Sequence, residues 1–588
     1  MFFLRFSYCF SIMLLSSLLL FTKAESKSQD QQEKKYPVSS FKIRYPNKHV
    51  DLPEEEELLS LKVKLSKKNH AYAQTEEGLP SEELQLLDIS QKTEETWFYE
   101  SAIVEIAQAI VSRFNQKGFI GIIVTVDPKD IQASGEDIRP KDQKDLSLVV
   151  LAYSVKETSS VSLGERFASD HSLNHPAHRH IIRNSPVQEG DLVDRKRLND
   201  YVRRLNRYPN RQVDIQLTGS KEKERLDIDF LINENKAIRA YIGAENTGTK
   251  NTSQWLQHIG LAHYHLTGKD DIFSLHYATT GLENLHSIQA SYESPFFSYQ
   301  DLRWNAYISW SSFNSSQLGI FNDEFSGNNE GESLGIKAAV RQKEDFFIDL
   351  IASATWRHIS VNNRLAKLSG KEDFLIPSLA VQIERKRKTS KIFGSLGIEG
   401  NVSRIARTEK DKIELLGRST KDNSWQIIKA SLFASYYLFE EKENRKNKAS
   451  QHEISLNAGG QYAFSYRLIP QMQKVIGGMR SNRGYPQSLG AGDHAFFIQN
   501  EYTYHSFFPQ KKYEIAARLF LDVSRSINNK HLSFEPNKTM LGSGIGFDIK
   551  AKDYLKISGD WGVALKSLNL DKFSAGHNRA YLSLNILY

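Results

Sequence analysis

The chain has 588 residues, which is too long for one compact core, so several domains are expected. Its net charge of +7 is spread over this length, which argues against nucleic-acid binding because that function needs clustered Lys and Arg. Aromatic residues make up 11% of the chain although the mean hydropathy is polar, at −0.48, as in chains whose apolar residues alternate with polar ones.

Residues 1–24 are predicted to be a secretory signal. Arg5 precedes an apolar stretch at 10–21, and Thr22-Lys23-Ala24 follows as a small-residue cleavage site. Cys9, the single cysteine, lies in this segment, so the mature chain should contain no disulfide and no thiolate metal site. A polar segment follows at 25–40, and no later run of eighteen apolar residues predicts a membrane-spanning helix.

Residues 41–155 are predicted to form a small α+β domain. Apolar residues from Ile103 to Phe114 recur at helical spacing, and Gly118 stands where this amphipathic helix should end. Strands are predicted at 41–45, 119–126 and 146–155, where they could cover the apolar stripe of the helix.

Residues 156–235 are predicted to form a second domain of similar plan. We expect a strand near 160–167, a helix at 194–207 that Pro209 ends, and strands at 212–218 and 226–232. One side of this helix carries four apolar or aromatic residues: Leu198, Tyr201, Val202 and Leu205. Both predicted domains have the order strand, helices, strand, strand. This order resembles that of the polypeptide-transport-associated (POTRA) domain.

Four histidines, His171, His175, His178 and His180, occur near the start of the second domain. Their spacing could suit a metal, but no run of carboxylates or cysteines accompanies them. We therefore interpret them as exposed residues of a linker or first helix, and we predict no metal and no other cofactor.

From Ala237 to the end, alternating segments are separated by polar turns, which predicts a transmembrane antiparallel β-barrel at residues 236–588. Outer loops are predicted at 314–331, 404–423, 469–493 and 526–538, with 469–493 as the sixth. The closing strand places Leu582, Leu584, Ile586 and the terminal Tyr588 on one face. Candidate strands begin near residues 237, 255, 271, 285, 300, 332, 345, 373, 390, 424, 452, 494, 512, 539, 553 and 578, about sixteen in all.

The predicted fold is therefore two α+β POTRA-like domains in the periplasm, followed by a barrel of about 16 strands in the outer membrane. Alternation turns Leu519 and Leu521 towards lipid. The same rule turns Asp522, and Glu501 on the neighbouring strand, into the lumen.

The sixth loop contains the most specific motif of the chain. Residues 477–486 read Gly-Gly-Met-Arg-Ser-Asn-Arg-Gly-Tyr-Pro, and Gly492-Asp493 follows. This resembles the Arg-Gly-aromatic signature of the two-partner secretion transporters, the haemolysin secretion/activation family of the outer-membrane assembly superfamily. Asn482 departs from the valine that is usual there, but Arg483, Gly484 and Tyr485 match. Agreement extends to residues 185–187, 205–209, 281–282, 292–295 and 520–522.

The resemblance implies a transporter that secretes, and in some cases activates, a large exoprotein such as a haemolysin or adhesin. It implies that Arg483 pairs with Asp522, and less securely with Glu501, while Gly484 permits the turn and Tyr485 packs the loop tip against the wall. Lipid and the barrel assembly machinery, through the strand ending in Tyr588, are the other implied partners.

The POTRA-like domains are expected to capture the unfolded exoprotein at an exposed sheet edge. The candidate surface combines the helix residues Leu198, Tyr201, Val202 and Leu205 with the strand that starts at Gln212.

Three alternatives stay open on the residues alone. The first is a machine that inserts other barrels into the membrane, and the second is a passive porin or receptor. The third, a barrel enzyme, is disfavoured because no arrangement of Ser, His and acid stands out, so no catalytic residue is predicted. A neighbouring gene for a large, repeat-rich secreted protein would favour export.

Overall fold

The computed structural model describes residues 33–588 apart from 48–51, 77, 90–95, 169–171, 250–252, 297–298, 319–322, 364–366, 439–451, 508–512, 553 and 569–572. The predicted signal segment with Cys9, and also His171, lie outside the described residues. Within the described part, no helix combines the length and the apolar character needed to cross a bilayer.

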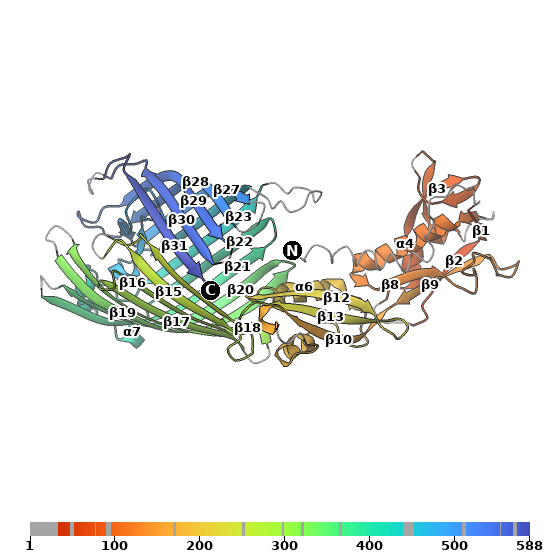
Figure 1. The fold of residues 1–588 in the computed structure, drawn as a ribbon, viewed down its shortest axis with the longest axis horizontal. Helices are drawn as coiled ribbons and strands as arrows, with labels where there is room; N and C mark the ends of the chain where they lie inside the picture. The colour runs from red at the N-terminus through yellow and green to blue at the C-terminus, as the bar shows by residue number, and fades with distance from the viewer. Residues whose placement is uncertain are drawn as a thin grey trace. The chain divides into compact units, whose positions relative to one another are not determined.

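The chain divides into two structural units (Figure 1). The first consists of Met1–Lys156, Glu189–Arg195 and Gly219–Leu226, and the second contains Glu157–Gln188, Lys196–Thr218 and Asp227–Tyr588.

The first unit contains a long helix and three sheets, the smallest of which pairs β7 with β11. A three-stranded sheet has the order β2-β9-β8, and a five-stranded sheet has the order β1-β6-β4-β3-β5. The elements are β1 (Lys35–Val38), β2 (Ser40–Arg44), α2 (Glu55–Leu59), β3 (Lys62–Lys68), β4 (Ala71–Ala73), β5 (Ser81–Gln85), α3 (Leu86–Ile89), β6 (Thr96–Tyr99), α4 (Glu100–Lys117), β7 (Phe119–Ile120), β8 (Ile122–Val126), β9 (Asp145–Ala152) and β11 (Val193–Asp194).

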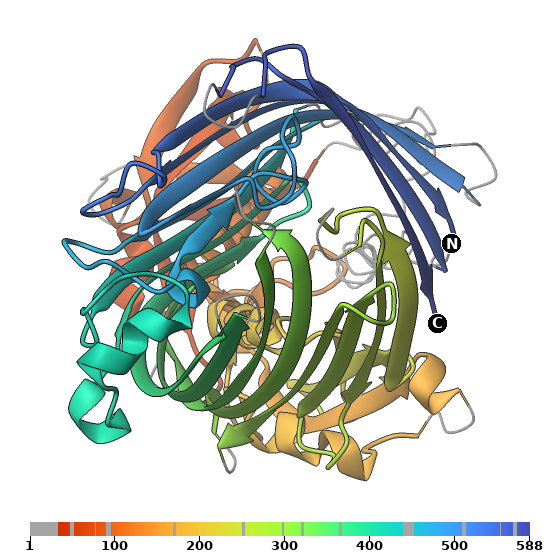
Figure 2. The same cartoon turned by 90° about the vertical axis from the view of Figure 1, so that its left-hand side faces the viewer.

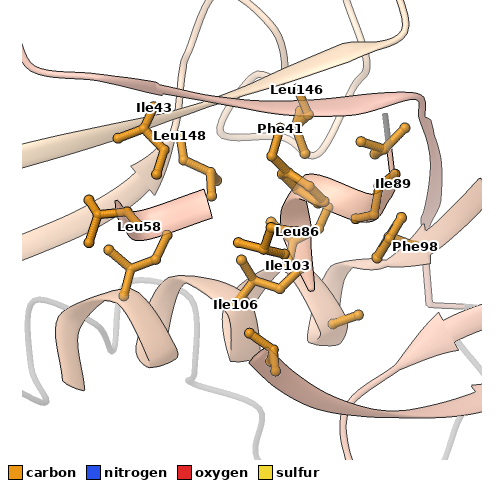
Figure 3. Packing of buried hydrophobic residues seen from close by; sticks show 14 of the residues in the cluster. Phe41, Ile43, Leu58, Leu86, Ile89, Phe98, Ile103, Ile106, Leu146 and Leu148 are labelled. Carbon is orange, nitrogen blue, oxygen red and sulfur yellow. The ribbon is translucent and has the colours of Figure 1, made fainter. Parts of the chain in front are cut away.

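Helix α4 buries the predicted apolar stripe against the first unit's core. Ile103, Ile106 and Phe114 are among its buried residues, and Gly118 ends the helix with a φ of 100°, a left-handed conformation that favours glycine. Figure 3 shows Ile103 and Ile106 gathered with Phe41, Leu86 and other apolar side chains of this core.

The five-stranded sheet was not predicted from the sequence. Its strands are short, and β3 reads Lys-Val-Lys-Leu-Ser-Lys-Lys, so charged residues dilute its alternation. Strand β1 also lies inside residues 25–40, which we predicted only as a polar segment without secondary structure of its own. Parallel pairing of β4 with β6 joins residues far apart in the chain, and local periodicity carries no information about such pairing.

The second α+β module repeats the sheet order of the first. Its sheet runs β10-β13-β12, so its first strand lies beside its last, as β2 lies beside β9. Its elements are β10 (Ser154–Leu163), the 3₁₀ turns Glu165–Phe167 and Pro176–His178, α5 (Arg179–Arg183), α6 (Arg195–Leu205), β12 (Arg211–Gly219) and β13 (Arg225–Glu234). The layout is POTRA-like in both modules, as predicted.

Residues from Ile238 onward form a closed barrel, which Figure 2 shows as a ring of strands. Its sixteen strands are β14 (Ile238–Glu245), β15 (Leu256–Tyr264), β16 (Ile272–Thr280), β17 (Leu285–Phe296), β18 (Tyr299–Leu318), β19 (Asp323–Lys343), β20 (Phe346–Asn363), β21 (Leu368–Lys386), β22 (Ser390–Gly400), β23 (Gln426–Tyr437), β24 (His452–Tyr462), β27 (His494–Phe507), β28 (Tyr513–Ile527), β29 (Lys538–Ala551), β30 (Leu555–Ala564) and β31 (Asn578–Leu587). The prediction of a barrel of about 16 strands is confirmed.

The ring closes where β31 pairs antiparallel with β14, from Tyr241 opposite Leu587 to Glu245 opposite Ser583. Closure gives each backbone group a ladder partner, which an unclosed sheet in hydrocarbon could not do. Outward residues are exposed apolar ones, such as Leu519 and Leu521, whereas their neighbour Asp522 is fully buried inside.

One predicted loop is mostly strand. We expected an outer loop at 314–331, but β18 continues to Leu318 and β19 already begins at Asp323. Ladder pairing between these strands persists through polar residues, for example Asn314 opposite Ser326. Polar composition therefore does not mark where a strand ends in this long hairpin.

Candidate functional site

The sixth odd-numbered connection of the ring, called loop 6 here, comprises residues 463–493 between β24 and β27. It contains a 3₁₀ turn, Pro470–Met472, and the short strand pair β25 (Lys474–Ile476) and β26 (Gly490–Gly492). The odd connections lie at the end of the barrel opposite the residues that Arg204, Arg207 and Arg211 of the second module contact, which are in or next to even connections. Loop 6 therefore belongs to the predicted outer end.

Arg483 of loop 6 is buried against two acidic residues of the barrel wall. Its Nε and one terminal nitrogen donate to the two carboxylate oxygens of Asp522, at 2.8 and 2.7 Å, and its main-chain N–H donates to Oδ2 at 2.9 Å. The other terminal nitrogen donates to Glu501. Arg483 is 3% exposed and Asp522 is 0% exposed, so this bidentate pair is withdrawn from water.

The guanidinium of Arg483 also lies over the ring of Phe520, with 3.6 Å between its carbon and the ring centroid. A planar cation above an aromatic face gains further electrostatic stabilisation. Strand β28 thus supplies both Phe520 and Asp522, two residues apart on the same inward face.

Gly484 has a role different from the predicted one. We expected it to permit a sharp turn, but the residues of loop 6 with left-handed backbone include Gly477 (φ 100°) and Gly478 (φ 85°), and Gly484 is not among them. A Cβ on Gly484 would lie 2.6 Å from the carbonyl oxygen of Val563 on β30. Glycine is needed here because the loop backbone lies directly on the wall.

Tyr485 is fully buried and fixes the loop tip beside Arg483. Its hydroxyl donates to the carbonyl oxygen of Lys566, at 2.6 Å, and lies 3.2 Å from that of Leu541. Its own carbonyl oxygen accepts from the hydroxyl of Tyr581 at 2.8 Å. The motif residues Arg483, Gly484 and Tyr485 therefore contact β28, β30 and β31 from inside the ring.

A second arginine binds acids on the lumen wall near this site. Arg518 of β28 donates from Nε to Asp560 at 2.7 Å and from a terminal nitrogen to Asp548 at 2.8 Å. Arg518 therefore joins β28 to acids of β29 and β30.

The helix surface predicted to capture substrate is instead part of the second module's core. Leu198, Tyr201 and Leu205 are 3%, 8% and 3% exposed, and the Tyr201 hydroxyl donates to the carbonyl oxygen of Ile181 at 2.7 Å. This part of the prediction was wrong because an amphipathic stripe faces its own sheet first. Val202 is half-buried, whereas Gln212 on β12 is exposed.

Arginines at the end of α6 and in the residues that follow it bind acids in or next to the even-numbered turns of the barrel. Arg207 donates to Asp349, at 2.5 and 3.1 Å, and to Glu384 at 2.8 and 2.9 Å. Arg204 donates to Asp301 at 2.6 Å, and Arg211 donates to both oxygens of Asp270. We missed this junction, although the basic run at the end of the helix could have signalled it.

The described histidines of the second module are not exposed as predicted, although His180 does lie in its first helix, α5. His178 is buried, with Nδ1 3.2 Å from the Ser162 hydroxyl, and His180 Nε2 lies 3.0 Å from Asp270. His175 caps a 3₁₀ turn by accepting from the Ala177 N–H. Among the described residues, no group of three or more His, Cys, Asp or Glu side chains could hold a metal ion.

A closed sixteen-stranded barrel, POTRA-like modules and an arginine-bearing loop docked inside the ring together define an outer-membrane β-barrel protein. The haemolysin secretion/activation protein family model, ShlB/FhaC/HecB, matches residues 225–549, more than half of the chain. The chain belongs to this family.

A curated relative is the heme/hemopexin transporter protein HuxB of Haemophilus influenzae, strain 86-028NP. It is 21% identical over 370 residues, which cover 58% of this chain and 59% of the relative. The chain thus matches less than two thirds of the length of that relative.

Solved structures share the whole fold at low sequence identity. CdiB from Escherichia coli aligns with a TM-score of 0.65 at 14% identity and covers 98% of both chains. CdiB from Acinetobacter baumannii gives 0.58 at 14% identity, over 98% of this chain and 97% of that one. BamA from Haemophilus ducreyi lacking POTRA domains 1–3 gives 0.50 at 13% identity, over 94% of this chain and all of that one.

Proposed function

We propose that this protein secretes a large partner exoprotein across the outer membrane by two-partner secretion, without ATP or another cofactor. Membership of the haemolysin secretion/activation family supports this proposal, and a closed ring of sixteen strands offers a lumen as the path. The partner would pass unfolded or extended and could be a haemolysin or an adhesin.

The observation that carries the proposal is the position of Arg483. A buried, bidentate ion pair holds loop 6 against the inner face of the barrel wall, on the side of the lumen that an extended chain would pass. Such a pair is costly to leave half-made, so the docked loop has a defined resting place. We propose that loop 6 closes the pore at rest and shifts during passage.

In this proposal the two modules, residues 41–155 and 156–235, capture the partner in the periplasm. Strand β12 is an edge strand of its sheet, and Gln212 and Asp214 are exposed along it. An extended segment could add to such an edge through main-chain hydrogen bonds, with little demand on sequence. The barrel itself would be inserted by the assembly machinery through its last strand, which ends beside Tyr588.

The test is Arg483→Ala, made in cells that also express the candidate partner exoprotein. Removing one member of a buried charge pair costs about 3–5 kcal/mol, so the loop should lose its resting place and export should fall at least about tenfold. The measurement is the amount of exoprotein in the medium, together with the heat-modifiable mobility that reports a folded barrel.

Arg480→Ala is the matched control, because Arg480 lies in the same loop but its side chain is 82% exposed. It should leave export near the parent level. Normal export by a correctly inserted Arg483→Ala variant would refute the proposed role of loop 6.

A further inference from the structure

Three outer loops meet around a single buried arginine, Arg418. Loop 5 comprises residues 401–425 between β22 and β23, and loop 7 comprises residues 528–537 between β28 and β29. Arg418 of loop 5 donates to both carboxylate oxygens of Asp493 in loop 6, at 2.6 and 3.1 Å. It also donates to Glu535 of loop 7 at 2.9 Å and to the Asn528 side chain at 3.1 Å.

Asp493 is the point in loop 6 where these contacts converge. It is fully buried, and besides Arg418 it accepts the N–H of Leu468 at 2.9 Å and the N–H of Asn529 at 2.8 Å. Asp493 immediately precedes β27, so these bonds fix the base of loop 6, whereas Arg483 fixes its tip.

A second arginine strengthens the link between loops 6 and 7. Arg467 of loop 6 donates to both oxygens of Glu535, at 2.7 and 2.9 Å. Glu535 therefore receives two guanidinium groups, one from loop 5 and one from loop 6. Both arginines are nearly inaccessible, with side chains 5% and 7% exposed, so water screens these interactions little.

Apolar side chains beneath these ion pairs bind the same loops to the barrel. Residues of β20, β21 and β23 with inward-facing side chains pack against loop 5 and loop 6 in one buried cluster. Its members are Ile359, Val361, Phe374, Ile376, Ile413, Leu416, Trp425, Ile427, Ala463, Leu468, Ile469 and Met472. Loop 5 contributes Ile413 and Leu416 from its short helical turns, α8 (Lys410–Ile413) and the 3₁₀ turn Glu414–Leu416.

We propose that Arg418 is a positioning residue that holds loop 6 in its docked state, so that loops 5, 6 and 7 act as one latch at the outer end of the barrel. The contacts that support this are separate from those of Arg483. They hold the base of loop 6, so loosening the base should also ease the release of its tip. The importance of this latch for transport rests on the proposed function. That the latch keeps loop 6 docked can be tested whether or not the protein secretes an exoprotein.

The test uses a cysteine reporter at Ser481, which lies in loop 6 and is 4% exposed. In a Cys9→Ser background, Ser481→Cys is the only thiol, and its reaction with a membrane-impermeant maleimide on intact cells reports undocking of the loop. Adding Arg418→Ala should raise the labelling rate about tenfold, because the Asp493 and Glu535 carboxylates lose a buried partner.

Lys421→Ala is the matched control, since Lys421 is a loop 5 cation with a 71% exposed side chain. It should leave the labelling rate unchanged. Glu535→Gln is the second test variant; it removes the charge that both arginines share but keeps the side-chain volume, and a smaller increase is expected.

An unchanged labelling rate in an inserted Arg418→Ala barrel would overturn the inference. So would failure of both Arg418→Ala and Glu535→Gln to insert, because the network would then serve assembly rather than the docking of loop 6. Labelling requires no exoprotein. If Arg418→Ala leaves the labelling rate unchanged while Arg483→Ala abolishes export, the latch is refuted and the proposed function is not.

Discussion

Arg483 is held by a combination that a lysine could not reproduce. Its guanidinium donates two parallel hydrogen bonds to Asp522, donates to Glu501 from its third nitrogen and stacks over the ring of Phe520. Lysine has no planar face and presents a single charged point, so it could satisfy one of these acids at a time. The site therefore specifies a guanidinium rather than a positive charge.

Gly484→Ala tests the close approach of the loop backbone to the wall. The new methyl group would lie 2.6 Å from the Val563 carbonyl oxygen, which is inside van der Waals contact with rigid backbone. Overpacking of this kind costs about 1–3 kcal/mol, so loop 6 should dock less well. We expect faster maleimide labelling of the Ser481→Cys reporter.

Gly219→Ala provides the comparison for this variant, because no atom lies within 4 Å of a Cβ at that position. It should label at the parent rate. Equal labelling of the Gly484 and Gly219 variants would show that the wall yields to the methyl group.

The acids that Arg483 binds were predicted by the resemblance to the secretion family together with period-two alternation. Alternation placed Asp522 and Glu501 on the inward face, and both contact the arginine. The reason for Gly484 could not be predicted, because it depends on the distance to β30, nearly eighty residues further along the chain. The partners of Arg418 were missed for the same reason, since contacts between loops leave no periodic signal.

At the scale of elements, loop 7 should make the outer latch sensitive to acid. Burial alone would raise the pKa of Glu535, but hydrogen bonds and charge from Arg467 and Arg418 outweigh it and lower the pKa to about 2. Because this lies below the ordinary value of 4.5, the ion pairs contribute fully above pH 4.5 and are lost as the pH falls towards about 2.

We therefore expect the conductance of the purified barrel in planar bilayers to rise as the pH falls through this window. Glu535→Gln should conduct more than the parent above pH 4.5, and its conductance should depend less on pH below that value. Other carboxylates also titrate there, so the difference between the two proteins is the relevant quantity. Parallel pH curves would contradict the role assigned to Glu535.

The elements themselves were predictable to different degrees. Helix α4 and its glycine stop follow from strong local periodicity and end where expected. Helix α6 was also predicted, but its apolar stripe was assigned to substrate although it faces the module's own core. The stripe shows that a helix is half-buried and does not show what covers it.

At the scale of the whole molecule, locking the short pairing between β14 and β31 would distinguish secretion from the rival function of barrel insertion. Five residue pairs form the ladder between these strands, among them Ile242 with Ile586, and main-chain hydrogen bonds also join Ala240 with Tyr588 and Asn246 with Leu582. An insertion machine would need this seam to open, whereas passage through the lumen would not. A disulfide formed by Ile242→Cys with Ile586→Cys should therefore leave export of the exoprotein near the parent level.

The same double variant kept reduced is the control for the substitutions themselves. Loss of export only in the oxidised form would mean that the seam opens during function, and would move the evidence towards insertion. The bridge is geometrically reasonable because the two residues face each other in antiparallel register, where Cβ atoms lie about 4.5–5.5 Å apart.

The ion pair at Arg483 has a consequence for the ions that an open pore admits. If loop 6 leaves, Asp522 and Glu501 stay on the wall without the guanidinium that they bind. They lie close to Asp560, and Arg518 binds both Asp560 and Asp548, so this one cation serves two acids. The vacated surface carries an excess of negative charge. A conducting barrel would thus select cations over anions. The carboxylates that Arg483 had bound would also attract the lysines of a passing polypeptide.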